Sequence, residues 1–228
     1  MPDPFGQTTT VTYDAYDLLM LETWDPLGNR ITVGERRPDG TIDSSKPGND
    51  YRVLQPRLVM DPNRNRSAAA FDALGMVVGT AVMGKPEETL GDSLDGFEAD
   101  LAEAVVLDHL QNPLAAPHAV LGRATTRLVY DLSAYRRTRN QPNPQPAVVY
   151  TLARETHDAD LEPGQQTKVQ HSLSYSDGFG REIQKKIQAE PGPVPQRDAG
   201  GRIIVRADGQ PELTPNDVSP RWVGSGWT

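Results

Sequence analysis

The sequence contains no cysteine among its 228 residues, which excludes disulfide frameworks, thiolate zinc sites and cysteine nucleophiles. No run of 18 apolar residues occurs, so no segment is expected to cross a membrane as a helix. Aromatic residues make up only 6% of the chain and hydrophobic residues 36%, which argues against a thick helical core. The first six residues carry neither a basic nor an apolar stretch, so no secretory signal is expected there.

Side chains for catalysis or metal binding are also scarce. The four histidines, His109, His118, His157 and His171, are not spaced as metal ligands on one element. His171 falls on the apolar side of a predicted strand, where a buried and hydrogen-bonded imidazole is the expected outcome. We therefore expect no metal, no cofactor and no enzymatic activity in this chain.

Negative charge is concentrated in one segment. The net charge is −8, and residues 84–111 hold eight acidic residues against one basic residue, Lys85. The remainder is close to neutral, so the electrostatic footprint of a nucleic-acid partner is missing. A small basic cluster at Arg136, Arg137 and Arg139 is interpreted as a solvated loop, with an anion contact as the alternative.

Glycine and proline are abundant, with 20 residues of each, and they recur in a repeated motif. Asp25-Pro26-Leu27-Gly28-Asn29 repeats the pattern of Asp3-Pro4-Phe5-Gly6, and Asp61-Pro62-Asn63-Arg64-Asn65 repeats it again. In the first and third copies an aromatic–aspartate pair follows at the same spacing, as Tyr13-Asp14 and Phe71-Asp72. Weaker copies contain Tyr130-Asp131, then Tyr175, Asp177 and Gly180, and finally residues 198–202 and 207–209.

Each repeat has the composition of a turn followed by strands. Aspartate accepts hydrogen bonds from the backbone ahead of it, proline presets φ, and glycine supplies the left-handed position. The following residues alternate, since Thr8, Thr10 and Thr12 face one way and Val11 and Tyr13 the other. One such hairpin cannot bury its own face, so neighbouring units must pack together.

Two segments interrupt the repeats with turns. Residues 34–49 contain Arg37-Pro38-Asp39-Gly40 and are predicted as an inserted loop or a small hairpin. Residues 190–220 are predicted as a loop-rich stretch with at most one hairpin, in which residues 202–206 turn at Asp208-Gly209.

The acidic segment carries the one helical pattern of the chain. Leu94, Phe97, Leu101 and the apolar residues after them recur at about helical spacing. This pattern predicts one amphipathic helix within residues 86–112, which begins at Asp92 or Ser93 and ends at Asn112-Pro113. The helix is expected to be inserted between repeats and to pack against the sheet.

The repeated motifs resemble those of the Rhs/YD-repeat family, and four longer stretches resemble the B component of bacterial insecticidal Tc toxin complexes. Those stretches are residues 50–56 (DYRVLQP), 71–77 (FDALGMV), 174–182 (SYSDGFGRE) and 220–227 (PRWVGSGW). The resemblance implies a mainly β fold of consecutive antiparallel hairpins, forming a segment of a hollow shell, with one inserted α-helix. Both ends of the chain are then expected to be cuts within a longer protein.

This resemblance suggests a division of the chain into four parts. Residues 1–83 would hold YD repeats with the inserted loop at 34–49, and residues 84–120 the acidic helical insertion. Residues 121–189 would hold further YD-type hairpins, and residues 190–228 a Pro/Gly-rich loop with the start of the next repeat.

In function, the resemblance implies a structural wall segment that encapsulates a toxic C-terminal cargo before translocation. The implied partners are the remainder of the shell, the C component of the complex and the enclosed polypeptide, in a secreted or exported assembly. The family's β-propeller and its self-cleavage motif have no counterpart here, so docking to a pore component and protease activity are not carried over.

Other roles remain open on the sequence alone. Asp14, Asp72, Asp131 and Asp177 follow aromatics near strand ends, where capping of turn amides is a simpler role than acid–base catalysis or calcium binding. Their aromatic neighbours, Tyr13, Phe71, Tyr130 and Tyr175, are predicted to stack as a ladder across strands, with sugar binding as the alternative. The alternative function is accordingly a YD-repeat cell-surface module that contacts carbohydrate or a neighbouring cell.

Overall fold

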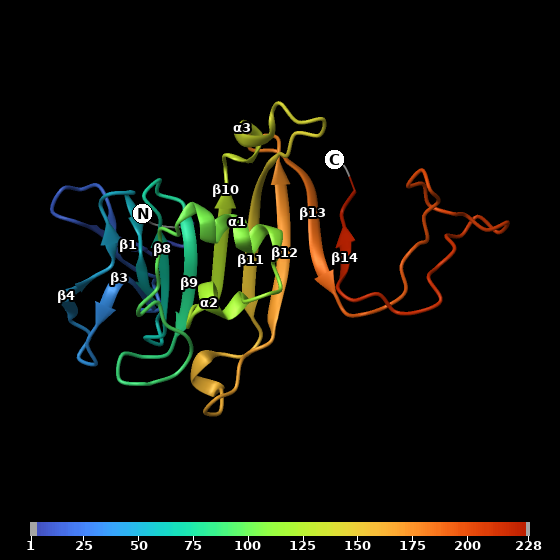
Figure 1. Ribbon diagram of the computed structural model, residues 1–228. Coiled ribbons are helices and arrows are strands. Elements are labelled where there is room, and N and C mark those ends of the chain that lie inside the picture. The colour runs from blue at the N-terminus through green and yellow to red at the C-terminus, as the bar shows by residue number, and fades with distance from the viewer. Residues whose placement is uncertain (1–3, 227–228) are drawn as a thin grey trace. The chain divides into compact units, whose positions relative to one another are not determined.

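A computed structural model describes residues 4–226, which fold mainly into antiparallel β-structure (Figure 1). The strands are β1 (Thr10–Tyr13), β2 (Met20–Trp24), β3 (Arg30–Arg36), β4 (Ile42–Pro47), β5 (Asn49–Asp50), β6 (Gln55–Pro56), β7 (Leu58–Met60), β8 (Arg66–Phe71), β9 (Val77–Met83), β10 (Thr126–Asp131), β11 (Ala147–Arg154), β12 (Val169–Ser176), β13 (Glu182–Ala189) and β14 (Arg221–Gly224). The helices are α1 (Glu103–Gln111), α2 (Pro117–Leu121) and α3 (Ala134–Thr138), with a short 3₁₀ turn at Asp158–Asp160. None of the helices in the described range is long and apolar enough to cross a membrane.

The strands follow one another through the sheet almost in chain order. Their order is β1-β2-β3-β7-β8-β9-β10-β11-β12-β13-β14, with β4 paired to β3, while β5 and β6 form a separate pair. Neighbouring strands are antiparallel, as in the six-pair ladder between β8 and β9. Successive antiparallel strands joined by short turns are what the hairpin repeats predict, so the predicted fold class is confirmed.

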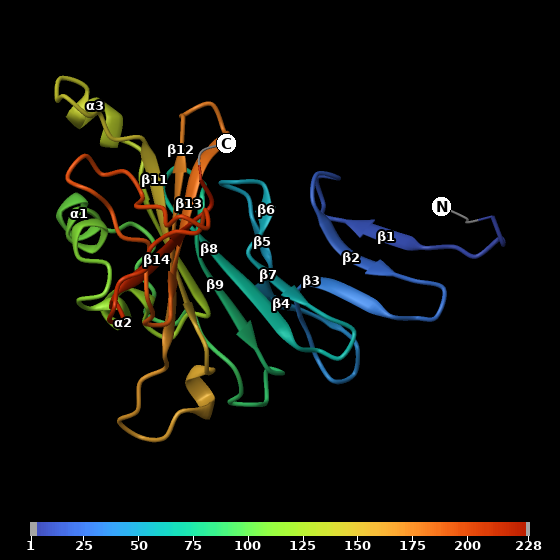
Figure 2. The same ribbon diagram turned by 90° about the vertical axis from the view of Figure 1, so that its right-hand side faces the viewer.

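The chain divides into two compact units. The first comprises residues 1–129 and 151–170, and the second comprises residues 130–150 and 171–228. In the first unit, α1 and α2 lie over one face of the sheet beside β9 and β10 (Figures 1 and 2). The core beneath them includes the fully or almost fully buried Leu121, Ala124, Val129 and Ala81. In the second unit, Tyr150 and Leu173 are the main buried side chains.

The helix of the acidic segment is shorter than the sequence pattern predicts. It begins at Glu103 rather than at Asp92 or Ser93, and it ends at the expected place, with Asn112 as its C-cap. Ser93 Oγ instead accepts the N–H of Asp95 in a local turn, and Gly96 has a positive φ of 73° that no helix allows. The apolar spacing of this stretch thus reflects loop packing on the sheet and not a helix.

The turn-rich segments agree with expectation in part. Residues 34–49 lie in the hairpin of β3 and β4, which is one of the two outcomes predicted for this segment. The short helices α2 and α3 were not predicted from any periodic pattern. Residues 190–220, expected to hold at most one hairpin, contain two tight turns, because backbone bridges join Arg197 to Ile203 and Val205 to Pro211. The earlier of these turns begins at Asp198, within one of the weaker copies of the repeat.

Candidate functional site

The repeated motif folds into a tight corner between adjacent strands. At Asp25 the backbone N–H donates to the carbonyl of Asn29, at 3.1 Å, and the Asp25 carbonyl accepts from Gly28, at 3.0 Å. The Asp25 carboxylate accepts the N–H groups of Leu27 and Asn29, at 2.9 and 2.8 Å. Gly28 has a φ of +84°, so this is a turn closed by a left-handed residue, the usual three-residue hairpin loop.

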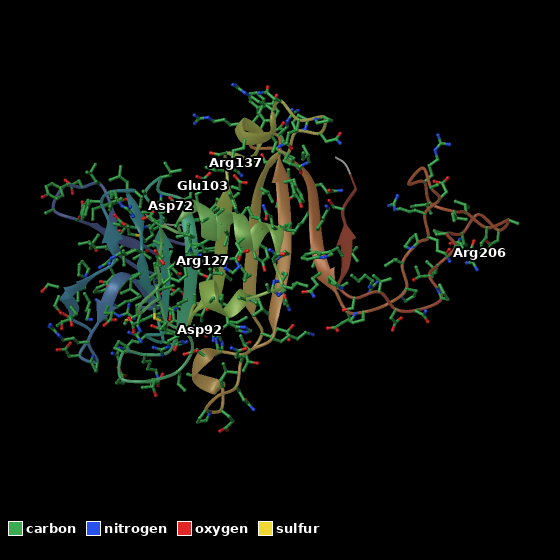
Figure 3. All side chains as sticks on the ribbon, in the orientation of Figure 1. Asp72, Asp92, Glu103, Arg127, Arg137 and Arg206 are labelled. Carbon is green, nitrogen blue, oxygen red and sulfur yellow. The ribbon has the colours of Figure 1, made fainter. Side chains whose placement is uncertain are left out.

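The same corner recurs at both kinds of sequence motif. It is present at Asp61, where Arg64 takes the left-handed position, and at Asp72, which the sequence analysis placed in an aromatic–aspartate pair (Figure 3). Asp177 and Asp198 likewise accept the N–H groups two and four residues ahead. At Asp72 the aspartate of the pair therefore begins the next corner, so this copy of the pair forms the same structural element as the Asp25 and Asp61 motifs.

Hydrogen bonding lowers the pKa of two of these aspartates, Asp25 and Asp177. The Asn29 amide and the backbone N–H groups of the corner lower the pKa of Asp25 below its usual value. The backbone N–H of Phe179 and the guanidinium of Arg181 lower the pKa of Asp177 in the same way. Carboxylates that accept turn amides in this manner stabilise the corners.

Two further aspartates of the predicted set cap looser turns. Asp14 Oδ1 accepts the N–H of Leu18 at 2.9 Å, and the hydroxyl of Tyr51 donates to Oδ2 at 2.6 Å. The Tyr51 hydroxyl lowers the pKa of Asp14, and Asp14 in turn raises the pKa of Tyr51. Asp131 accepts the N–H of Ser133 and pairs with Arg137, so that one arginine of the basic cluster neutralises a carboxylate of its own chain.

The remaining predicted repeat residues lie in strands or turns, in unlike surroundings. Asp3 lies outside the described residues, while Pro4 and Gly6 belong to a turn. Phe71 is buried on β8, whereas Tyr13 on β1 is 53% exposed, so these two rings do not share the environment that an aromatic ladder requires. Aromatic contacts are instead present between Tyr16 and Tyr51, and between Tyr150 and His171.

One face of the sheet in the first unit carries a pair of threonine hydroxyl groups. Strand register pairs Thr80 of β9 with Thr126 of β10 and with Ala69 of β8, and the Thr80 and Thr126 hydroxyls are 2.6 Å apart. Their neighbours Gly79 and Arg127 point to the opposite face, because side chains alternate along a strand. The face of Thr80 and Thr126 is therefore the one that the helices leave free.

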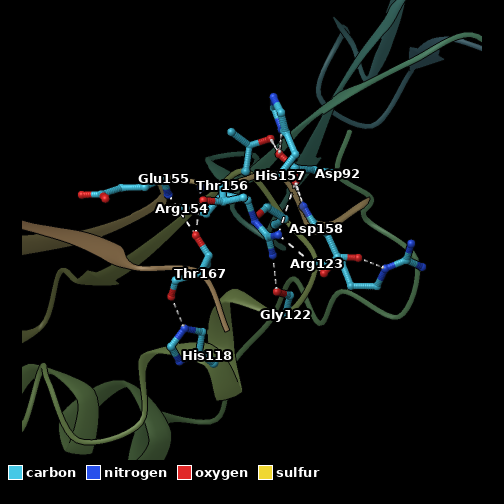
Figure 4. A network of polar contacts seen from close by, with 12 residues as sticks. Asp92, His118, Gly122, Arg123, Arg154, Glu155, Thr156, His157, Asp158 and Thr167 are labelled. Carbon is cyan, nitrogen blue, oxygen red and sulfur yellow. Dashed lines mark hydrogen bonds and ion pairs between the residues drawn. The ribbon is translucent and has the colours of Figure 1, made fainter. Parts of the chain in front are cut away.

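The helix-covered side of the same unit contains a buried polar network centred on Asp92 (Figure 4). The Asp92 side chain is fully buried, and its carboxylate accepts the hydroxyl of Thr125 and, at 2.8 Å, the backbone N–H of Asp158. His157 Nδ1 lies 2.9 Å from the carboxylate, and the buried Arg154 guanidinium lies 3.4 Å from it. Asp92 thereby joins the loop after β9 to the loop after β11.

The arginine and threonine of this network bind backbone as well. Arg154 donates to the carbonyls of Ala124 and Gly122, each at 2.7 Å, and Thr167 Oγ1 accepts the N–H of Thr156 at 2.9 Å. The carbonyl of Thr167 contacts His118 Nε2 at 2.8 Å. Because the buried charges are paired and hydrogen-bonded, the network holds three loops together.

The network does not have the geometry of a nucleophilic triad. In such a triad the hydroxyl contacts the imidazole and the carboxylate orients that imidazole from the other side. Here the Thr125 hydroxyl and His157 both contact the Asp92 carboxylate, so the threonine hydroxyl donates to the carboxylate and not to the imidazole. Within residues 4–226, no three His, Asp or Glu side chains converge as metal ligands.

The remaining histidines are structural contacts or buried groups. His171 is buried on β12 and its Nδ1 lies 2.5 Å from the hydroxyl of Tyr150, in keeping with the expected hydrogen-bonded imidazole. His109 is buried on α1.

The Asp92 network could not be predicted from the sequence, because its members share no local motif. They are far apart in the chain, and Asp92 and Thr167 are separated by 75 residues.

Comparisons with known proteins identify the fold but not a sequence family. No protein-family model matches the chain, and no curated protein matches it. The crystal structure of TcdB2–TccC3 without its hypervariable C-terminal region covers 96% of the chain with a TM-score of 0.62 at 18% identity. The crystal structure of TcdB2–TccC3–TEV covers 94% with a TM-score of 0.59 at 19% identity.

A third similar structure is the Tc holotoxin pore of Photorhabdus luminescens, with a TM-score of 0.57 over 96% of the chain at 18% identity. In each case the chain spans only 11% of the length of the solved chain. At these identities the likeness shows a common fold, which is that of one segment of a Tc toxin component.

Proposed function

We propose that the chain is part of the wall of a shell in a Tc-type toxin assembly, where it helps to enclose a toxic polypeptide before translocation. The observation that carries the proposal is the open sheet of successive hairpins, which matches TcdB2–TccC3 over almost the whole chain. A wall of this kind needs no bond chemistry, and its partners are the remainder of the shell and the C component. The assembly would be exported as a whole.

The two faces of the sheet support different roles in such a wall. One face is covered by α1 and α2 (Figure 2). The helix-free face presents the hydroxyl groups of Thr80 and Thr126 together with Val82, which alternation along β9 places on the same side as Thr80 and which is 47% exposed. We assign this face to the interior and the face under α1 and α2 to the outside.

A chimaera tests the proposal directly. The segment of TcdB2 or TccC3 that matches this chain is replaced by residues 1–228, and the assembled shell is treated with protease. Protection of the enclosed polypeptide, at the level of the unaltered shell, is the expected result. Digestion of the cargo by a chimaera that still assembles to the correct size contradicts the proposal.

Substitutions on the two faces refine the test. Thr80→Phe with Thr126→Phe adds apolar area to the proposed interior and is expected to slow cargo release. Leu90→Phe enlarges a side chain that is already 55% exposed, and serves as the control for added aromatic area. An equal effect of both variants would show that the Thr80 face does not line the interior.

Exposed aromatic side chains support a second candidate, a module that binds carbohydrate. Tyr13, Tyr16 and Trp24 are 53%, 72% and 41% exposed in the N-terminal hairpins. Rings of this kind stack on sugar faces, so a glycan array with the 228-residue chain distinguishes the two functions. Saturable glycan binding that is lost in Tyr16→Ala would favour the binding module over the wall.

A further inference from the structure

Arg127 is buried on the helix-covered face without the ion pair that a buried guanidinium usually has. It lies on β10 directly opposite Gly79 of β9 and is 1% exposed (Figure 3). Its guanidinium carbon is 4.4 Å from the centre of the Phe97 ring, and Nη1 donates to the carbonyl of Glu98. Its Nε is buried and has no hydrogen-bond acceptor among the described residues.

The backbone explains why the arginine and the ring come together at this point. A side chain at Gly79 would place its Cβ within 2.3 Å of the Phe97 ring, so the ring occupies the space that glycine leaves free. Arg127, the register partner of Gly79, then lies beside that ring. Burial lowers the pKa of Arg127 to about 10, with Glu98 and Asp100 counteracting at longer range, and the guanidinium stays protonated at neutral pH.

A pocket of about 150 Å³ adjoins this guanidinium. Phe97, Leu101 and Val120 form its apolar wall, and Asp95, Glu98 and Arg123 contribute charged groups. Arg123 is already paired with Asp158 at 2.6 Å, so among the described residues Arg127 is the cation that lines the pocket without a carboxylate partner. A cavity of this size accommodates a small organic molecule.

We propose that this pocket binds a small monocarboxylate, whose oxygen atoms accept hydrogen bonds from Arg127 and whose carbon chain packs against Phe97 and Leu101. Guanidinium and carboxylate match in charge and in planar geometry, and binding supplies the counter-charge that the buried arginine lacks. Asp95 and Glu98 offset the positive charge of the pocket, so a dianion such as sulfate is repelled more than a monoanion. This inference stands whether or not the chain is a shell wall.

Titration of the 228-residue chain with sodium propionate, at constant ionic strength set with sodium chloride, tests the proposal. Thermal unfolding is expected to shift upward with a saturable dependence, and at 100 times the dissociation constant the ratio of folded to unfolded chain rises about 100-fold. Line broadening of the propionate NMR signals measures binding without unfolding. A linear shift with no saturation, or tighter binding of sulfate than of propionate, overturns the proposal.

Variants locate the site. Arg127→Met is expected to abolish propionate binding and to remain folded, because an apolar side chain of similar length removes a buried charge. Phe97→Leu, which keeps the arginine, is expected to weaken binding several-fold through loss of the ring. Arg136→Met removes an exposed arginine and serves as the control. Unchanged propionate binding in Arg127→Met, with a wild-type circular dichroism spectrum, places the ligand elsewhere and overturns the proposal.

The carboxylate that binds in the pocket belongs either to a free small molecule or to a glutamate side chain of a polypeptide, and a titration distinguishes the two. N-acetylglutamate N-methylamide presents the side chain with its backbone capped, and is compared with propionate in the same titration. Binding of the capped glutamate at least as tightly as propionate supports the polypeptide source, and binding of propionate alone supports the small molecule. Binding of neither contradicts the proposal.

Discussion

Strands β9 and β10 lie under α1 and α2, whereas β1 and β2 have no helix over them (Figure 2). Beneath the helices Leu121, Ala81 and Val129 are at most 1% exposed, while every residue of β1 is exposed. The covered region can be stabilised by burial of side chains, and the uncovered hairpins depend on hydrogen-bonded corners and paired charges. The same kind of substitution should therefore have different consequences in the two regions.

The largest effect is expected at the polar network of the covered region. Asp92→Ala removes the buried one of the two carboxylates paired with Arg154 and leaves three groups that contact Asp92 without that partner, which should cost about 3–5 kcal/mol of unfolding free energy. Urea denaturation measures this cost. Asp39→Ala, in an exposed turn of the uncovered region, is the matched control, and a cost equal to that of the control would contradict the assigned role of the network.

Removal of a core side chain should have the next largest effect. Leu121 on α2 is completely buried, so Leu121→Ala is expected to cost about 3 kcal/mol through lost burial and the cavity it leaves. Leu90→Ala, at a side chain that is 55% exposed, should change stability by less than about 0.5 kcal/mol. Similar values for the two variants, again from urea denaturation, would show that α2 does not cover a packed core.

In the uncovered hairpins the main contributor is expected to be the Glu22 charge cluster. The carboxylate of Glu22 accepts the Arg30 guanidinium at 2.8 Å and the Thr32 hydroxyl at 2.7 Å. Burial alone would raise the pKa of Glu22, but the hydrogen bonds from Arg30, Thr32 and Trp24 outweigh it and lower the pKa below 4.5. Glu22→Gln should cost about 2 kcal/mol at pH 7.

The pH dependence of this cost follows from the direction of the shift. A pKa that is lower in the folded chain stabilises it at pH values above 4.5, and this contribution is lost as the pH falls through the folded-state pKa. The difference between wild type and Glu22→Gln should therefore shrink between pH 5 and pH 3, in denaturation measured at each pH. A difference that stays constant over this range would contradict the ion pair as its source.

The smallest effect is expected at a single corner. Gly28 has a φ of +84° and open space around the position of a Cβ, so Gly28→Ala adds only the strain of a left-handed alanine, about 1 kcal/mol. Gly28→Asn should cost less, because asparagine tolerates this conformation and Arg64 already adopts it at the corresponding position. Equal stability of wild type and Gly28→Ala would argue against the left-handed corner.

Sequence reasoning was most successful where structure depends on neighbours along the chain. Asp25, Asp61 and Asp72 each accept the amide four residues ahead, and such contacts are visible in the spacing of a motif. It failed for the start of α1, because Phe97 has helical spacing but packs on Gly79, which is 18 residues earlier. Sequence reasoning also did not predict that Arg127 and Asp92 are buried, because the residues that contact them belong to segments distant in the chain.

The amino-acid sequence by itself determined the corners and the alternation of the strands, since both arise from interactions within a few residues. Only the tertiary structure decided which face of the sheet the helices cover, and hence that Asp92 and Arg127 are buried while Thr80 and Thr126 line the free face. The reason is that burial depends on segments distant in the chain, and alternation assigns residues to two faces without saying which one will be covered.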